Sequence, residues 1–208
     1  MKGLFITLEG VEGCGKSTQI RLLSRFLTEK GIAHVVTREP GGTEIGDKVR
    51  KILLDVSNLR MEPLTELLLY AASRAQHVLE VIRPAILGGK IVLCDRFFDS
   101  TLAYQGHARG IDPELVKRSI EIATDGLKPD LTFLLDIPAE VGIERATKKG
   151  VDRLEGEDLV FHKRVRQGFL GLAKNEPHRI LVVDATCGVD ELQTKLRHIL
   201  EEKLRQWR

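Results

Sequence analysis

The sequence has few aromatic side chains and no long apolar run. Aromatic residues make up 5% of its 208 residues, and tryptophan occurs once. No uninterrupted apolar stretch approaches the roughly 18 residues that indicate a membrane-spanning helix. Residues 1–3 lead directly into a strand pattern, without the charged and apolar regions of a secretion signal. We therefore expect a soluble, cytoplasmic protein with no membrane partner.

Cysteine and net charge are also scarce. The cysteines, Cys14, Cys94 and Cys187, are widely spaced and odd in number, which fits reduced thiols better than a disulfide framework or a zinc cluster. Lysine and arginine number 32 against 30 acidic residues, which gives a net charge of +2. Such a balance creates no overall field that would attract nucleic acid or a membrane surface. Any anion must therefore be recognised locally, and we expect no nucleic-acid partner.

The distribution of apolar residues predicts a single α/β domain covering residues 1–208. At 42% hydrophobic, the chain can bury one sizeable core. Short, nearly continuous apolar runs alternate with helix-length amphipathic segments, which indicates a doubly wound parallel sheet. The expected strands are Leu4–Leu8, His34–Thr37, Ile91–Cys94, Leu131–Leu135 and Ile180–Val183. The expected helices are Lys16–Lys30, Glu44–Asp55, Glu62–Leu87, Pro113–Thr124, Ala139–Lys148, Asp158–Lys174 and Val189–Arg205.

The segment Gly10–Ser17 reads GVEGCGKS and matches the phosphate-binding pattern G-x-x-x-x-G-K-S/T. It lies between the first expected strand and the first expected helix, where backbone N–H groups and the helix N-terminus can bind a phosphate. Lys16 would reach the β- and γ-phosphates, and the hydroxyl of Ser17 would bind Mg²⁺. The alternatives are an ordinary glycine turn and, for Cys14, either a small loop residue or a reactive thiol.

Polar residues follow the third expected strand. Asp95 ends that strand, where it could hold Mg²⁺, and Arg96 could clamp a second phosphate. A solvated aspartate is the alternative for Asp95. Ser100, Tyr104 and Gln105 follow, at a spacing that could bring them along one face of a short helix, although each alone fits a surface position.

Three further segments carry candidate functional residues. A Pro-Gly-Gly turn within Arg38–Thr43 follows the second strand, where open α/β sheets bind ligands. Tyr70 and Arg74 are four residues apart on the third helix and could offer a stacking face beside a cation, or be a core tyrosine and a surface arginine. The segment Lys148–Glu157 is either a surface turn or a mobile lid. Four cations occur in or beside it: Arg145, Lys148, Lys149 and Arg153.

Four motifs in this order resemble thymidylate kinases over nearly the whole chain. They are GVEGCGKST at Gly10–Thr18, TREPGGT at Thr37–Thr43, DRFFDSTLAYQG at Asp95–Gly106 and DRLE at Asp152–Glu155. The resemblance implies a P-loop, nucleoside monophosphate kinase-like fold with a parallel five-stranded sheet flanked by helices, and a homodimer. It also implies the reaction of ATP with dTMP to give ADP and dTDP in dTTP biosynthesis, with Mg²⁺ as cofactor.

The resemblance also implies residue roles. The predicted catalytic residues are Lys16, Arg96 and Arg153, and the predicted metal ligands are Ser17 and Asp95. The predicted ATP-binding residues are Gly10, Val11, Glu12, Gly13, Cys14, Gly15, Lys16, Ser17, Thr18 and Arg145. The predicted dTMP-binding residues are Glu12, Glu39, Pro40, Arg50, Tyr70, Arg74, Arg96, Ser100, Tyr104 and Gln105.

The position of the catalytic arginine divides the thymidylate kinases. The phosphate loop of this chain contains no arginine, whereas the expected lid contains Arg153, so the chain resembles the bacterial type whose lid supplies the cation. Two alternatives stay open on the residues alone. One is another nucleotide or nucleoside kinase on the same scaffold. The other is a nucleotide-dependent switch, although the chain lacks the Asn-Lys-x-Asp motif that reads guanine.

Overall fold

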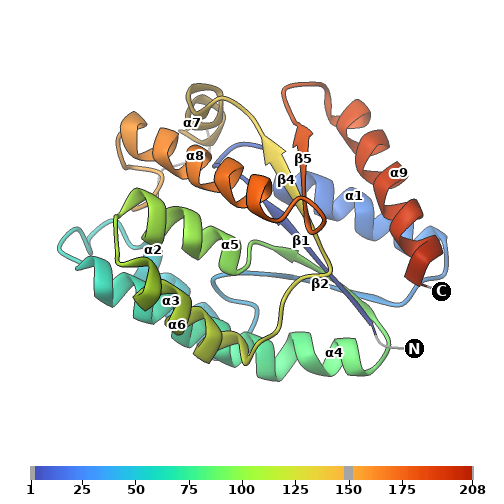
Figure 1. Cartoon of the computed structure of the whole chain (residues 1–208), viewed down its shortest axis with the longest axis horizontal. Coiled ribbons are helices and arrows are strands. Elements are labelled where there is room, and N and C mark those ends of the chain that lie inside the picture. The colour runs from blue at the N-terminus through green and yellow to red at the C-terminus, as the bar shows by residue number, and fades with distance from the viewer. Residues whose placement is uncertain (1–2, 148–151, 208) are drawn as a thin grey trace.

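The computed structural model describes residues 3–147 and 152–207 and contains a parallel sheet of five strands (Figure 1). The strand order is β2-β3-β1-β4-β5, which confirms the expected α/β fold. The strands are β1 (Leu4–Glu9), β2 (His34–Arg38), β3 (Ile91–Asp95), β4 (Leu131–Asp136) and β5 (Ile180–Asp184). Each is one residue longer at its carboxyl end than predicted, and each added residue is charged.

The helices largely follow the sequence prediction. They are α1 (Lys16–Glu29), α2 (Glu44–Leu54), α3 (Pro63–His77), α4 (Arg83–Leu87), α5 (Phe98–Thr101), α6 (Pro113–Thr124), α7 (Ala139–Thr147), α8 (Leu159–Asn175) and α9 (Val189–Trp207). Within the described ranges, none of these helices is long and apolar enough to cross a membrane.

Two helical segments differ from the prediction. The expected helix over residues 62–87 is divided into α3, the π-helical segment η1 (Val78–Ile82) and α4. Pro84 follows η1 and has no N–H group to donate to the preceding turn, which favours a local change of helix geometry. The second segment is α5, which continues into the π-helical η2 (Leu102–Ala108). It is not among the expected helices, although the spacing of Ser100, Tyr104 and Gln105 is compatible with a short helix.

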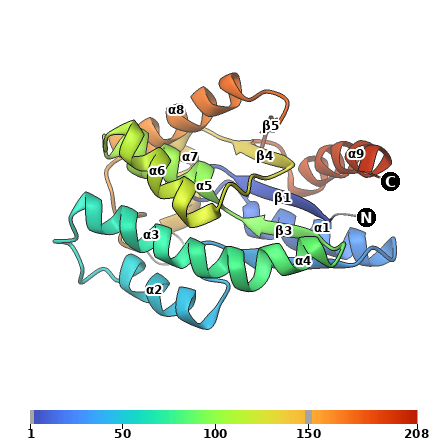
Figure 2. The same ribbon diagram turned by 60° about the horizontal axis from the view of Figure 1, so that its bottom comes forward.

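Apolar side chains on the two faces of β1 belong to different core clusters. Leu4, Ile6 and Leu8 belong to the cluster that includes α1 and α9. Phe5 belongs to a second cluster, which includes side chains from η1, α4 and α6. Figure 1 shows α9 beside α1, and Figure 2 shows α2 lying against α3. The sheet is therefore covered on both faces, as the nearly continuous apolar strands indicate.

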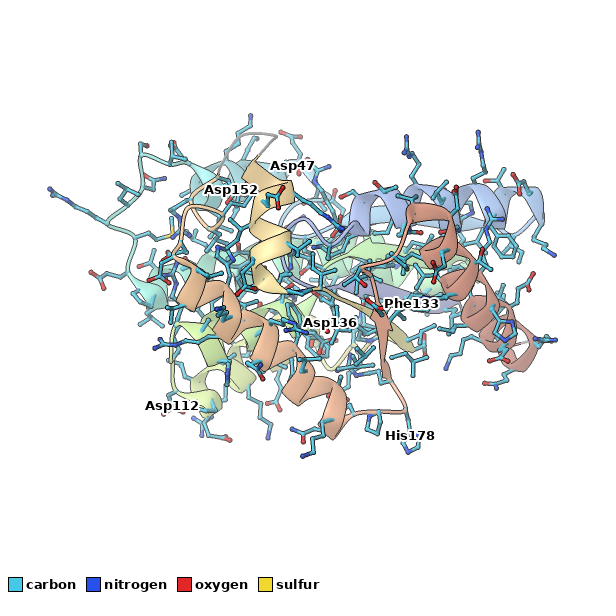
Figure 3. All side chains as sticks on the ribbon, turned by 90° about the horizontal axis from the view of Figure 1, so that it is seen from above. Asp47, Asp112, Phe133, Asp136, Asp152 and His178 are labelled. Atoms are coloured by element: carbon cyan, nitrogen blue, oxygen red, sulfur yellow. The ribbon has the colours of Figure 1, made fainter. Side chains whose placement is uncertain are left out.

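Charged residues at the carboxyl ends of the strands face the loops that follow. Asp136 ends β4 beside α8 (Figure 3), where its carboxylate accepts hydrogen bonds of 2.7 and 2.8 Å from Arg166. Asp95 ends β3 next to the first turn of α1. In open parallel sheets, ligands bind at this edge. The fold therefore gathers the candidate site residues at one end of the sheet.

Candidate active site

The phosphate loop connects β1 to α1. Gly10, Gly13 and Gly15 all have positive φ angles, a conformation that glycine adopts without steric cost. A Cβ atom on Gly13 would also collide with the carbonyl oxygen of Gly142 in α7. The Lys16 ammonium lies over the loop and donates hydrogen bonds of 3.1 and 3.0 Å to the carbonyl oxygens of Gly10 and Val11. The glycines thus give the loop its shape, and Lys16 is held at its centre.

A cavity of about 810 Å³ opens beside this loop. It brings together most of the predicted site residues: Glu12, Gly13, Gly15, Lys16, Ser17, Thr18, Glu39, Pro40, Arg50, Tyr70, Arg74, Asp95, Arg96, Ser100, Tyr104, Gln105 and Arg145. Gly10, Val11 and Cys14 are buried in the loop and do not line the cavity. Arg153 does not line it either, and Lys148 and Lys149 lie outside the described residues.

The predicted metal ligands are in contact. The hydroxyl of Ser17 donates a 2.8 Å hydrogen bond to the Asp95 carboxylate. A hydroxyl and a carboxylate oxygen are the hard donors that Mg²⁺ prefers, and this ion commonly takes only one or two protein ligands when it also binds phosphates. Within the described part of the chain, no group of three or more histidine, cysteine or acidic residues could hold a metal. The pair therefore suits a phosphate-bound ion rather than a protein-enclosed one.

Arg96 connects the end of β3 to the phosphate loop. Its φ of 70° lies in the left-handed region that few residues other than glycine adopt. Its guanidinium donates hydrogen bonds to the carbonyl oxygen of Gly10 at 2.9 Å, to the Ser100 hydroxyl at 3.1 Å and to the Glu12 carboxylate at 2.9 Å. These contacts hold a positive charge on the cavity wall.

Glu12 is enclosed by donors and cations. One of its oxygens, Oε1, accepts from Arg96 and from the Tyr104 hydroxyl, the latter at 2.5 Å. The other oxygen, Oε2, lies 3.5 Å from Nδ1 of His162, a residue of α8 that is 1% exposed. Burial alone would raise the pKa of Glu12, but Arg96, His162 and Lys16 outweigh it and hold this pKa well below its usual range. Glu12 is therefore ionised, and its carboxylate points toward Arg96, Tyr104 and His162.

The part of the cavity beside α3 presents Tyr70 and Arg74. The Arg74 guanidinium is 2% exposed and donates from Nε to Glu39 at 2.7 Å and from Nη1 to the Thr101 hydroxyl at 3.0 Å. Glu39 also contacts His77 Nδ1 at 3.0 Å. Both oxygens of Glu39 are thus engaged, and this predicted ligand-binding carboxylate holds Arg74 in place. Arg50, on α2, donates to the carbonyl oxygen of Pro40 at 2.9 Å.

Arg153 differs most from its predicted position. It is 8% exposed, and its guanidinium donates hydrogen bonds to the carbonyl oxygen of Leu53 at 2.8 Å and to Glu66 of α3 at 2.6 Å. The same carboxylate accepts a 2.7 Å hydrogen bond from the side-chain amide of Gln105. Arg153 is therefore anchored beside the cavity, on the far side of Glu66, and does not reach into it.

Sequence reasoning missed several buried residues of this site, among them Glu66, His77 and His162. Glu66 precedes Tyr70 by four residues on α3, so helical periodicity could have placed both on one face. His77 lies three residues after Arg74 on α3, so helical periodicity could also have placed these two side chains on one face. No spacing in the sequence could have indicated His162. Its contact with Glu12 joins α8 to the phosphate loop, and these two elements lie far apart along the chain.

The fold and the site define a P-loop nucleotide kinase, because the phosphate-loop motif, a strand-end carboxylate and the guanidinium of Arg96 share one cavity. The thymidylate kinase family model matches residues 8–196. The chain belongs to the thymidylate kinase family, whose members phosphorylate dTMP to dTDP.

Individual relatives support this assignment. The chain is 53% identical over 201 residues to thymidylate kinase of Geotalea uraniireducens, with 93% of this chain and 94% of that protein covered. It is 53% identical over 203 residues to thymidylate kinase of Deinococcus radiodurans, with 97% and 98% covered. The crystal structure of thymidylate kinase from Ehrlichia chaffeensis matches with a TM-score of 0.79 and 34% identity, covering 96% of this chain and 100% of that one.

The contact between Glu12 and His162 predicts a pH-dependent stability. Burial disfavours the imidazolium, but the Glu12 carboxylate outweighs it and raises the pKa of His162. A raised histidine pKa stabilises the fold fully below the free value of about 6.5, and this contribution is lost as pH rises through the pKa of the folded state. We expect the difference in unfolding free energy between wild type and His162→Phe to be largest below about pH 6.5 and to shrink as the pH rises above that value.

Chemical denaturation at several pH values measures this difference. In Glu12→Gln, NMR titration should give a lower His162 pKa than in wild type. An unchanged His162 pKa in that variant would contradict the assigned cause.

Proposed function

We propose that this chain transfers the γ-phosphoryl group of ATP to the phosphate of dTMP within the cavity described above. The observation that carries the proposal is the position of Arg96. Its guanidinium lies on the same cavity wall as the phosphate loop and is joined to that loop through Gly10 and Glu12. A second anion-binding group at this position suits a phosphate acceptor that faces the donor phosphate. Family membership supports the identity of both substrates.

The donor nucleotide would occupy the phosphate-loop side of the cavity. The loop amides and the N-terminus of α1 would bind the β- and γ-phosphates, and Lys16 would exchange its loop carbonyl partners for phosphate oxygens. Arg145 and the turn at Thr186 also line the cavity and would border the adenine. Ser17 and Asp95 would hold Mg²⁺, which would neutralise charge on the donor phosphates when bound.

The acceptor would lie between α3 and η2. Arg96 and Arg50 would bind its phosphate, and Tyr70 would stack on the pyrimidine. Arg74, Ser100 and Gln105 would hydrogen-bond the base. By resemblance to the family, the Tyr104 ring would pack near C2′ of the sugar, and its hydroxyl bond to Glu12 would hold the ring in place. Glu12 would act mainly by holding Arg96 and Tyr104.

Catalysis would consist of positioning and charge neutralisation. An oxygen of the acceptor phosphate attacks the γ-phosphorus, a new P–O bond forms, and the bond to the β,γ-bridging oxygen breaks to release ADP. No side-chain nucleophile takes part. Lys16 and Arg96 bring donor and acceptor phosphates together against their mutual repulsion, and both remain charged throughout.

The proposal takes residues 1–208 as one domain with a lid at about residues 148–157, of the bacterial type. Asp152, Leu154 and Glu155 line the cavity, so the described part of this segment borders the space that would hold the nucleotides. The phosphate loop has no arginine, and by resemblance to family members with such a loop the lid would supply the catalytic cation. Arg153 stays the predicted cation, and to act directly it would have to leave Glu66.

A coupled assay of ADP release tests the proposed reaction. With ATP and Mg²⁺, we expect turnover with dTMP that greatly exceeds turnover with dUMP, AMP or thymidine. Lys16→Ala should nearly abolish it, because the ammonium would no longer hold the donor phosphates, whereas Lys174→Ala, an exposed control near the end of α8, should retain it. Turnover with a different acceptor would contradict the assignment of the base pocket.

The Arg153→Ala variant tests the lid assignment. If Arg153 supplies the catalytic cation, kcat should fall by a factor of about 100 or more while dTMP binding changes little. Calorimetric titration with dTMP, alongside steady-state rates, separates the two effects. Arg205→Ala on α9 is the matched control, because that side chain is exposed and distant in sequence from the lid. An unchanged kcat would remove Arg153 from catalysis.

We also propose that the chain forms a homodimer through α3 and α6. These helices pack together, and apolar side chains on and beside them are exposed: Leu64 at 49%, Leu68 at 55%, Leu79 at 63% and Ile122 at 83%. Clustered exposed apolar residues are typical of protein interfaces. A second copy of this chain would cover them.

Light scattering after size exclusion tests the dimer. Wild type should have twice the mass of one chain, and Leu68→Glu should shift it to a monomer by placing a charge in the interface. Val182→Glu changes a residue that is 49% exposed on the edge strand β5 and should leave the mass unchanged. A monomeric wild type would refute the proposal.

A further inference from the structure

Gln105 lines the cavity, and its side-chain amide can direct either its oxygen or its NH₂ group toward the cavity. The side chain belongs to η2 and is 1% exposed. A glutamine amide has an accepting oxygen at one end and a donating NH₂ group at the other. Which end a ligand meets depends on the partner that holds the opposite end. The partner of Gln105 therefore decides what the cavity offers at this point.

That partner is Glu66, which can only accept hydrogen bonds while it is ionised. Gln105 Nε2 donates to Glu66 Oε1 at 2.7 Å, and Glu66 is 1% exposed. Turning the amide over would place its oxygen against a buried carboxylate and leave the NH₂ group without this acceptor. Gln105 Oε1 has no partner among the described residues and is not sealed from solvent. The amide therefore presents an acceptor to the cavity.

Two arginines keep Glu66 ionised. Arg153 donates to Oε2 at 2.6 Å, and Arg109 donates to the same oxygen at 3.2 Å. Burial favours the neutral acid, but the Gln105 hydrogen bond and the two arginines outweigh it and lower the pKa of Glu66. Arg109 also forms an ion pair with Glu157 at 2.7 Å. The positive charges of Arg109 and Arg153 are therefore matched by the negative charges of Glu66 and Glu157. The carboxylate thus remains an acceptor at neutral pH.

Arg74 provides the opposite polarity in the same cavity. Its Nε and Nη1 atoms are held by Glu39 and Thr101, and its Nη2 atom makes no hydrogen bond within the described residues. The cavity therefore offers a donor from Arg74 and an acceptor from Gln105. Thymine presents a carbonyl oxygen beside a protonated N3, whereas cytosine presents an amino group beside an unprotonated N3. The fixed pattern matches thymine and opposes cytosine.

We propose that Glu66 is a positioning residue that determines base specificity. By holding the Gln105 amide with its oxygen toward the cavity, it selects a pyrimidine whose N3 carries a hydrogen and rejects cytosine. This inference rests on the proposed function, because it places the acceptor base beside Tyr70, Arg74 and Gln105. Glu66 itself does not touch the base and acts only through Gln105.

The Glu66→Gln variant tests this role. An amide at position 66 can donate as well as accept, so the Gln105 amide could turn over and offer its NH₂ group to cytosine N3. We expect the ratio of kcat/KM for dTMP to kcat/KM for dCMP to fall by about tenfold or more relative to wild type. Arg74 still favours the carbonyl, so the preference should not reverse. Glu29→Gln, an exposed residue at the end of α1, should leave the ratio unchanged.

The outcomes separate this inference from the proposed function. If Glu66 is merely structural, both substrates lose activity equally, the ratio stays constant and the inference is overturned. If wild type fails to phosphorylate dTMP, the proposed function fails instead. Should Glu66→Gln not fold, NMR of the Gln105 side-chain NH₂ group in wild type decides. Saturation with thymidine should leave the bond to Glu66 intact, and its loss would overturn the inference.

Discussion

The site depends on one guanidinium, that of Arg96, held between the carboxyl end of β3 and the phosphate loop. A non-glycine residue at a φ of 70° costs on the order of 1–3 kcal/mol, so surrounding contacts must offset the strain. Hydrogen bonds to Gly10, Ser100 and Glu12 supply those contacts. Because they reach both the loop after β1 and the helix after β3, the two proposed phosphate positions are fixed relative to each other before any ligand binds.

Buried carboxylates give the other functional side chains their direction. Glu12 holds Arg96 and Tyr104, Glu39 holds Arg74, and Glu66 holds Gln105. An ionised carboxylate only accepts hydrogen bonds, so each partner must direct a donor group at its carboxylate. Gln105 then turns its amide oxygen toward the cavity, and Arg74 turns its Nη2 atom toward it. Glu12 and Glu39 line the cavity themselves, whereas Glu66 does not line it and acts through Gln105.

Strands and the phosphate loop could be predicted because their signals are local. Strands that are covered on both faces appear in the sequence as apolar runs. Because the prediction followed these runs, each predicted strand ended one residue before the charged residue that ends the observed strand, such as Asp95 and Asp184. The loop combines a short motif with its strand-to-helix context. By contrast, the partners of Gln105 and Glu12 come from other elements, and α5 with η2 lacks an extended helical apolar pattern. These features require the tertiary structure.

The position of Arg153 would connect the proposed base recognition to the proposed lid. Removing one partner of a buried ion pair costs roughly 3–5 kcal/mol, because the other charge is left poorly compensated. Arg153 therefore leaves Glu66 only for a site with comparable negative charge, and the phosphates of two bound nucleotides provide such a site. Arg109 would continue to hold Glu66 at 3.2 Å and keep the Gln105 amide in place. Under this arrangement, the lid arginine could move toward the phosphates while base selection is maintained.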